Sequence, residues 1–316
     1  MTTYLIRRFF QSIVTLFIVS IATFGMMHLM PNGVVRGMLG QRATPERIAA
    51  LTHRLGLDQP LYVQYWSWLD RLLFHFDLGQ SNQGGGRNVS DLIKENLGQS
   101  VYIVGLALFF TIVISVPVGV LQATRRNSIA DYTMTTFSFI GYAVPVFFLG
   151  VILRNLFQVQ FHLIPTAAQI ASFHDAFSQP EQMILPVATL VIGGVAGYSR
   201  YMRSSMLDEI TQDYVRTAIA KGASKRRVLY GHVLRNAMIP MITLIGLSLP
   251  TLVGGTLLVE QIFNIHGIGV LTINAALSSD FAVVLGTTML TAIVTVIGSL
   301  VADISYAALD PRVRLT

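Results

Sequence analysis

The side chains that usually carry catalysis or bind metals are sparse in this 316-residue chain. It contains no cysteine and only seven histidines, and no two histidines have metal-ligand spacing on one helix face. A disulfide, a thiolate metal site and a cysteine nucleophile are therefore excluded. No H-E-x-x-H sequence or Ser/His/Asp grouping is present, and no G-x-x-x-x-G-K-[ST] loop could bind the phosphates of ATP. We interpret Gly267-Ile268-Gly269 as a tight turn, because it lacks the strand and helix of a nucleotide loop.

Polar and basic residues are concentrated in a segment of roughly 35 residues between Tyr201 and Arg235. A helical element begins at Asp213 and continues through the small-residue stretch Thr217–Lys221. Gly222 interrupts it, and Ser224 can cap a second helix. The pattern predicts two short helices joined at a glycine, with small apolar residues on one side and basic residues around them. Such a protrusion is suited to docking onto another protein.

Long apolar stretches lie on both sides of this polar segment and determine where it lies. The chain is 53% hydrophobic and 12% charged, with a mean hydropathy of +0.59, whereas soluble domains carry about 25% charged residues. Six stretches free of Lys, Arg, Asp and Glu are long enough to cross a bilayer, which needs about 20 residues. They lie between Arg8 and Met30, Glu95 and Arg125, Asp131 and Arg154, Glu181 and Arg200, Arg235 and Glu260, and Asp280 and Asp303. We therefore predict an all-α integral membrane protein with six transmembrane helices.

The first apolar stretch also resembles a signal peptide, because Arg7-Arg8 precedes it. No small-residue cleavage site follows the stretch, so we expect an uncleaved first span. Orientation follows from the basic residues, because loops that stay in the cytoplasm retain Lys and Arg. An N-terminus inside the cell places fourteen of the 22 Lys and Arg residues on the cytoplasmic side, which makes both termini cytoplasmic. These are Arg7, Arg8, Arg125, Arg126, Arg200, Arg203, Arg216, Lys221, Lys225, Arg226, Arg227, Arg235, Arg312 and Arg314.

The run Lys225–Arg227 has a simpler interpretation as well, namely a topology signal that contacts anionic lipid. That role is compatible with docking. Prolines interrupt several predicted spans, which favours either close packing alone or a bundle that bends around a central passage. These are Pro117, Pro145, Pro186 and Pro250. Charged residues are absent from the middle of every predicted span, which disfavours an ion-coupled secondary transporter.

The loop after the first span contains two amphipathic segments. Thr44 is a predicted N-cap of the first helix, and Gly56 is its predicted stop. The second segment is Leu61–Phe74, whose aromatic residues suit the boundary between lipid and water. We expect this region to be an interfacial cap without a ligand, and Gly84–Gly86 to form a flexible tip.

A family resemblance rests on the polar loop. Residues 213–222 read DYVRTAIAKG and residues 232–240 read HVLRNAMIP. Together they resemble the "EAA" loop of ABC-importer permeases, whose coupling helix sits in a groove of the ATP-binding subunit. The consensus glutamate falls on Arg216 and the usual proline on Arg235, and both departures resemble the peptide-transport branch. The resemblance implies that docking involves Asp213, Tyr214, Arg216, Thr217, Ala218, Lys221, Gly222, Ala223, His232, Arg235, Asn236 and Pro240.

Further stretches resemble the dipeptide and oligopeptide permeases of the first-subunit type. They are Leu55–Leu61, Gln64–Tyr65, Asp77–Ser81, Arg203–Leu207, Glu260–Gly269 and Leu309–Arg314. Pro31–Gly33 departs from the proline-glycine-aspartate-proline turn common in that branch. The resemblance covers nearly the whole chain and implies a type I ABC importer permease fold. It divides the chain into an N-terminal transmembrane helix (1–30), an external helical region (31–99), an ABC transmembrane type-1 domain (100–306) with its coupling loop (203–237), and a cytoplasmic tail (307–316).

The resemblance implies a multi-pass permease of the bacterial cytoplasmic membrane that forms a pathway for dipeptides or oligopeptides. Its expected partners are the lipid bilayer, a second homologous permease, two ABC ATPase subunits and an extracytoplasmic substrate-binding protein, with no nucleic acid. ATP and Mg²⁺ are expected on the ATPase subunits, so this chain is not an enzyme and has no cofactor. The same scaffold also carries nickel chelates, glutathione and sugars, which remain alternative cargoes. An intramembrane enzyme is disfavoured because catalytic groupings are missing.

Overall fold

The computed structural model of this protein describes residues 2–28, 35, 39, 43–54, 56–83, 86–165, 170–254 and 256–309. Within these ranges the regular structure is helical, apart from two isolated β-bridges. The helices are α1 (Thr2–His28), α3 (Pro45–Arg54), α4 (Leu61–Phe74), α5 (Val89–Thr124), α6 (Ile129–Ala143), α7 (Val146–Arg154), α8 (Phe173–Ser178), α9 (Pro180–Ile210), α10 (Asp213–Ala220), α11 (Lys225–Val228), α12 (Leu234–Gly254), α13 (Leu257–Ile262), α14 (Ile268–Leu277) and α15 (Phe281–Leu309). Two π-helical segments, η2 (Asn155–Gln160) and η3 (Leu229–Val233), continue α7 and α11.

Five helical segments in the described residues are long and apolar enough to cross a membrane. They are Ile6–Met26, Val89–Thr124, Pro180–Ile210, Lys225–Gly254 and Phe281–Ile304. These segments match the predicted first, second, fourth, fifth and sixth spans. The chain is therefore an all-helical, multi-pass membrane protein.

The predicted third span is broken rather than continuous. Helices α6 and α7, the latter with η2, are apolar enough to cross together, but they are bent by 96°. The break falls at Pro145, which precedes α7 and has no N–H to continue the hydrogen bonding of α6. In contrast, Pro117, Pro186 and Pro250 lie inside the continuous helices α5, α9 and α12. Of these four prolines, only Pro145 lies at a break between helices.

Close contacts between small residues and their neighbours hold the long helices together. A Cβ atom on Gly119 of α5 would lie 2.5 Å from the Cβ of Met202 on α9. A Cβ on Gly246 of α12 would lie equally close, at 2.5 Å, to the Cβ of Ala302 on α15. Any side chain at either glycine would push the helices apart, as expected where helices associate in lipid through close packing.

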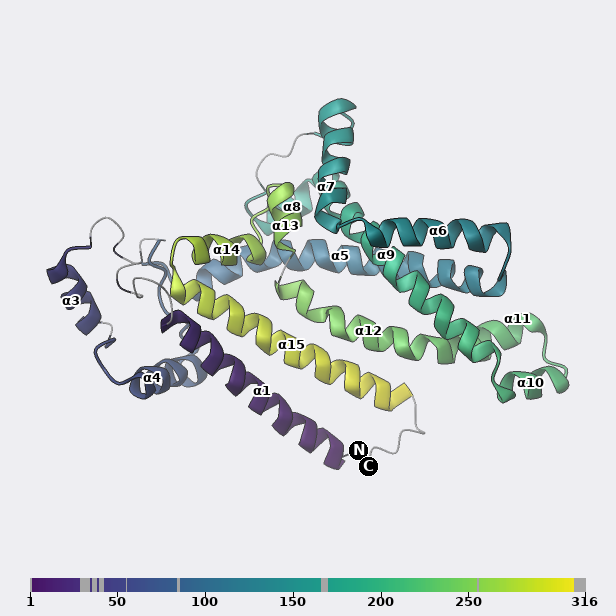
Figure 1. Cartoon of the computed structure of the whole chain (residues 1–316), viewed down its shortest axis with the longest axis horizontal. Coiled ribbons are helices and arrows are strands. Elements are labelled where there is room, and N and C mark those ends of the chain that lie inside the picture. The colour runs from purple at the N-terminus through teal and green to yellow at the C-terminus, as the bar shows by residue number, and fades with distance from the viewer. Residues whose placement is uncertain are drawn as a thin grey trace.

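The loops and short helices lie at two opposite ends of the bundle and along its upper side, where α7, α8 and α13 are labelled (Figure 1). Helices α10 and α11 lie at the right-hand end in that view, with the last turns of α5 and α9 and the first turn of α12. The start of α1 and the later part of α15 point toward the same side in that view. They are adjacent there, because Arg8 Nε lies 2.6 Å from Asp303 Oδ2. Helices α3, α4 and α14 lie at the other end.

Both predicted helices of the first loop are present. Helix α3 follows Thr44, whose Oγ1 accepts a hydrogen bond from the N–H of Arg47 at 3.4 Å. It ends at Arg54, two residues before Gly56, which has a φ of +65°. The predicted N-cap and stop are therefore confirmed.

Helix α4 has the predicted bounds and packs one face against the bundle. Tyr65 and Trp68 are buried in a cluster with Phe24 of α1 and Phe281 of α15, whereas Trp66 is 58% exposed. The lipid-boundary role of this helix stays a prediction. The predictions that concern Pro31–Gly33, Gly84–Gly85 and residues 310–316 lie outside the described residues.

Candidate functional site

The predicted docking segment folds as two short helices that protrude from one end of the bundle (Figure 1). Two residues separate the end of α9 from the start of α10, and residues 221–224 connect α10 to α11. Residues 213–228 are termed the docking knob below. Because α11 continues through η3 into α12, the segment Lys225–Gly254 is one helical unit. The sequence predicted a separate second helix, whereas the structure joins it directly to a span.

Gly222 creates the turn between the two helices of the docking knob. Its φ of +82° lies in the left-handed region, which favours glycine. The N–H of Gly222 donates to the carbonyl of Ile219 at 2.9 Å, and the N–H of Ala223 donates to the carbonyl of Ala218 at 3.1 Å. These two bonds form the Schellman arrangement that ends many helices. Nothing lies within 4 Å of a Cβ built on Gly222, so backbone conformation rather than crowding requires glycine there.

Ser224 caps the second helix of the docking knob, as predicted. Its backbone is extended, with a φ of −64° and a ψ of 148°, and its Oγ accepts a hydrogen bond from the N–H of Arg227 at 3.4 Å. This bond satisfies one of the N–H groups that the first turn of a helix leaves unpaired. The glycine turn and the serine cap together fix the direction in which α11 leaves α10.

Apolar side chains attach the docking knob to the bundle. Val215 of α10 and Val228 of α11 are each 5% exposed and pack against residues of α5, α9 and α12. The cluster consists of Val120, Ala123, Met202, Met206, Val215, Val228, Val233, Ala237 and Met241. Full burial of a valine or methionine contributes about 1.5–3 kcal/mol. The docking knob is therefore held firmly by the ends of three long helices.

The outer surface of the docking knob combines one large apolar side chain with small and charged ones. Ile219 is 56% exposed. Its exposed neighbours in the docking knob are Asp213, Arg216, Thr217, Ala220, Lys221, Ser224, Lys225, Arg226 and Arg227. An apolar centre with a polar rim is the usual anatomy of a protein-binding surface.

Tyr214 connects the docking knob to both neighbouring long helices. Its hydroxyl donates to Oε2 of Glu209 on α9 at 2.6 Å. Burial, reinforced by this hydrogen bond, raises the pKa of Tyr214 to about 12, while the side chain of Asn236 on α12 acts in the opposite direction. The hydroxyl is therefore neutral at physiological pH and remains a hydrogen-bond donor.

The predicted docking residues separate into three groups. Asp213, Arg216, Thr217, Lys221 and Gly222 are exposed on the docking knob. Tyr214, Ala218 and Ala223 are half-buried and pack on its inner side. His232, Arg235, Asn236 and Pro240 lie farther along the chain, on η3 and α12, and only Asn236 reaches Tyr214.

The predicted set omits Ile219, the central apolar side chain of the outer surface. A spacing of four residues would place Ile219 on the same face as the buried Val215. Helix α10 ends at Ala220, however, and the side chain of Ile219 is exposed rather than buried. Sequence spacing could not reveal this exposure, because it depends on where the neighbouring helices end.

A second polar cluster lies toward the opposite end of the bundle, around Glu260 of α13. The Oγ of Ser100 on α5 donates to Glu260 Oε1 at 2.7 Å, and the N–H of Val270 donates to Oε2 at 3.1 Å. The carboxylate thus occupies the N-terminus of α14, where helix N–H groups favour an anion. A Cβ on Gly267 would overlap this carboxylate, which explains the glycine as a structural turn rather than part of a nucleotide loop. Burial raises the pKa of Glu260.

Fold and site together define a multi-pass membrane protein whose protruding helices are direct extensions of its spans. Comparison with known families identifies that class. Residues 115–315 match the family described as "Binding-protein-dependent transport system inner membrane component". Residues 1–85 match the N-terminal region of binding-protein-dependent transport system membrane components. The chain belongs to this family of transport components, because the first match covers more than half of its length.

Individual relatives extend the comparison over the full chain. The oligopeptide transport system permease protein AppB of Bacillus subtilis is 38% identical over 316 residues, which cover 99% of this chain and 100% of that protein. Putative peptide permease proteins of Brucella ovis and Brucella suis are 36% identical and cover 100% of both chains. Among solved structures, the inward-facing MetNI methionine ABC transporter is similar with a TM-score of 0.53 and 18% identity. That match covers 70% of this chain and 97% of the solved chain, and it shows a shared fold.

Proposed function

We propose that this chain is the permease subunit of an ATP-driven importer in the bacterial cytoplasmic membrane, and that it forms part of the pathway for short peptides. The docking knob carries the proposal, because its outer surface has the anatomy of a protein-binding surface. It is separated from α9 by only two residues and continues through η3 into α12. The relatives named above are oligopeptide and peptide permeases, which supports peptides as the cargo.

The proposed topology has six spans, with α6 and α7 acting together as one broken span. Six crossings return the end of α15 to the side on which α1 starts, in agreement with the ion pair between Arg8 and Asp303. The docking knob lies toward the same end and carries exposed basic residues, including Lys221 and Lys225–Arg227. Since basic residues are retained in the cytoplasm, this end and both termini are cytoplasmic in the proposal.

The proposed importer contains two ABC ATPase subunits. The docking knob of this chain binds one of them, and a second, homologous permease binds the other. A groove on the ATPase would receive Ile219 and the small residues around it, while the basic rim would meet acidic side chains. In the proposal ATP and Mg²⁺ are bound by those subunits, because this chain has no phosphate-binding loop sequence. An external binding protein delivers the peptide at the opposite end, near α3, α4 and α14.

The proposed mechanism uses the docking knob as a lever. When the ATPase subunits close on ATP, they displace the docking knob, which is attached directly to two spans. Helix α10 is separated from α9 by two residues, and α11 continues into α12. A displacement at the docking knob therefore tilts both spans and shifts the bundle between outward-open and inward-open states.

Site-specific crosslinking tests the proposal directly, because the chain contains no cysteine. Ile219→Cys places a single thiol on the docking knob. Val159→Cys places one with matched exposure, 55% against 56%, on η2, which lies away from the docking knob. We expect a thiol-specific crosslinker to join the ATPase subunit to Ile219→Cys and not to Val159→Cys. Gly222→Trp, which adds bulk where the free chain has open space, should insert normally and lose ATP-driven uptake. Equal crosslinking from both cysteines, or wild-type uptake by Gly222→Trp, would overturn the docking assignment.

A further inference from the structure

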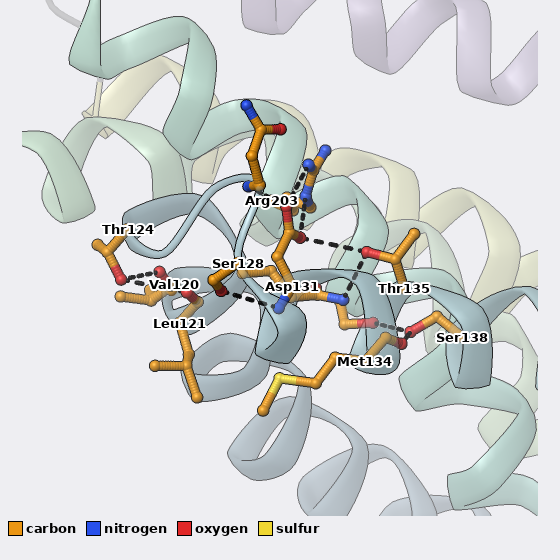
Figure 2. Close-up of polar contacts among 12 residues, drawn as sticks. Val120, Leu121, Thr124, Ser128, Asp131, Met134, Thr135, Ser138 and Arg203 are labelled. Atoms are coloured by element: carbon orange, nitrogen blue, oxygen red, sulfur yellow. Dashed lines mark hydrogen bonds and ion pairs between the residues drawn. The ribbon is translucent and has the colours of Figure 1, made fainter.

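A buried ion pair joins α6 to α9 (Figure 2). Asp131, in the first turn of α6, is only 2% exposed. Arg203 of α9 donates from Nε to Oδ1 and from Nη2 to Oδ2, each at 3.0 Å. This two-pronged geometry is the strongest and most directional contact that an arginine makes with a carboxylate. In the sequence, Asp131 stands out only as the boundary of a predicted span and Arg203 only as a basic residue at the start of the coupling loop.

Further donors converge on the same carboxylate, as Figure 2 shows. The N–H of Asn127 donates to Asp131 Oδ2 at 3.0 Å, and Thr135 Oγ1 donates to Oδ1 at 3.3 Å. Gln122 of α5 donates in turn to Thr135 Oγ1 at 3.4 Å. Ser128 caps α6 by accepting from the N–H of Asp131 at 3.2 Å. The carboxylate is therefore fixed in place, and the network connects α5, α6 and α9.

The seam between α6 and α9 continues through two more contacts. The hydroxyls of Ser138 and Ser199 lie 3.2 Å apart. The guanidinium of Arg200 lies over the rings of Phe139 and Tyr142, 4.6 and 4.9 Å from their centroids. Such cation–π contacts are stronger where water is excluded. Successive turns of α6 are thus attached to α9 by polar or cationic contacts.

Arg203 lies on the part of α9 that supports the docking knob. The neighbouring Met202 and Met206 are fully buried in the cluster that contains Val215 and Val228 of the docking knob. Helix α6, in contrast, packs mainly against α9 and α5. Motion of the docking knob must therefore reach α6 through these two helices, and Asp131–Arg203 is the ion pair at that contact.

We propose that Asp131 and Arg203 are a positioning pair that makes α6 follow the docking knob when the ATPase subunits move it. The inference rests on the proposed function. The 96° bend after Ala143 separates α6 from α7, and α7 is attached at the opposite end, where Arg154 Nη1 donates to the carbonyl of Ile262 at 2.5 Å. Helix α7 also packs against α9, where Val146 faces Gly193 and Gly150 faces Thr189. Helix α6 can therefore follow the docking-knob end of α9 while α7 stays with the earlier part of that helix. Without the ion pair, the docking knob would move the end of α9 and leave α6 behind.

The test measures how many peptides enter per ATP hydrolysed by the complete complex in proteoliposomes. Asp131→Asn removes the ion pair, and Asp303→Asn is the matched control, because it breaks the pair that joins α1 to α15. We expect the ratio to fall severalfold for Asp131→Asn and to stay at the wild-type value for Asp303→Asn. The ratio should fall no further in the double variant Asp131→Asn/Arg203→Met than in either single variant. The effects of two substitutions do not add when the two residues act as one unit. If Asp131→Asn does not accumulate, Arg203→Lys gives the same test, because it keeps the charge but not the two-pronged contact.

An unchanged ratio in Asp131→Asn or Arg203→Lys, at any amount of assembled complex, would overturn the inference and leave the pair a purely structural role. The inference is also overturned if Asp303→Asn lowers the ratio as much as Asp131→Asn does. Failure of the proposed function itself would appear in the wild-type protein, as uptake that needs no ATPase subunit. Failure of this inference alone leaves wild-type uptake intact.

Discussion

The turn at Gly222 offers a perturbation whose size can be worked out from the structure. Its φ of +82° is unfavourable for any residue with a Cβ, and alanine in this region costs about 1–2 kcal/mol. Asparagine tolerates the region better, whereas β-branched valine tolerates it less well. Since nothing lies within 4 Å of the added Cβ, no steric clash contributes. If the folded turn loses one or two kcal/mol of stability, the ratio of folded to locally unfolded docking knob falls by a factor of about 5–30.

Hydrogen exchange of residues 218–224 in the purified protein measures this opening. We expect exchange to be faster by about 5–30-fold in Gly222→Ala, faster still in Gly222→Val, and nearly unchanged in Gly222→Asn. Gly231→Ala is the control, because Gly231 also has open space around its Cβ position but no positive φ. Peptide uptake per ATP should fall in the same order, since a loosened docking knob transmits less displacement to α9 and α12. Wild-type exchange in Gly222→Val, or greater damage from Gly222→Asn than from Gly222→Val, would refute the reasoning.

Three further predictions concern other parts of the molecule. In variants that keep only one tryptophan, brominated lipids should quench the fluorescence of Trp66, which is 58% exposed, far more than that of Trp68, which is 9% exposed. If aqueous iodide quenches Trp66 more strongly than the brominated lipids do, α4 faces water. Because the pKa of Glu260 is raised in the folded protein, the protonated carboxyl group is favoured there. Its contribution to the free energy of unfolding should be complete below pH 4.5 and lost as the pH rises through the raised pKa. The thermal unfolding temperature should therefore depend on pH in this way in the wild type but not in Glu260→Gln. Identical profiles of unfolding temperature against pH in the two proteins would contradict the prediction. Gly246→Val should reduce folded protein in size-exclusion chromatography, whereas Gly25→Val, with open space, should not.

Local chemistry made several elements predictable from sequence. The Leu61–Phe74 helix, the break at Gly222 and the cap at Ser224 each depend on a few neighbouring residues, and the structure confirms all three. The five continuous spans were predictable because an apolar run of sufficient length has few alternatives to a membrane helix. The course of the chain at prolines was not predictable. A proline inside a helix persists where neighbouring helices compensate for its missing hydrogen bond, so Pro117 continues a helix and Pro145 ends one.

The features that the sequence did not predict depend on contacts between residues that are far apart in the chain. Asp131 and Arg203 are 72 positions apart, and Ser100 and Glu260 are 160 apart. Neither pair has a local pattern that would reveal it, because each forms only when separate helices meet. The candidate site shows the same division. Its turn and cap were predictable, whereas the exposure of Ile219 and the burial of Val215 depend on how α5, α9 and α12 end beneath it.

ATP-driven uptake by the reconstituted complex tests the central claim most directly. The chain would be placed in proteoliposomes with a second permease, the two ATPase subunits and the external binding protein, and the entry of a labelled short peptide would be followed. We predict accumulation that requires ATP, both ATPase subunits and the binding protein, and no ATP hydrolysis by this chain alone. Uptake driven by an ion gradient without ATP, or ATP hydrolysis by the isolated chain, would contradict the assignment.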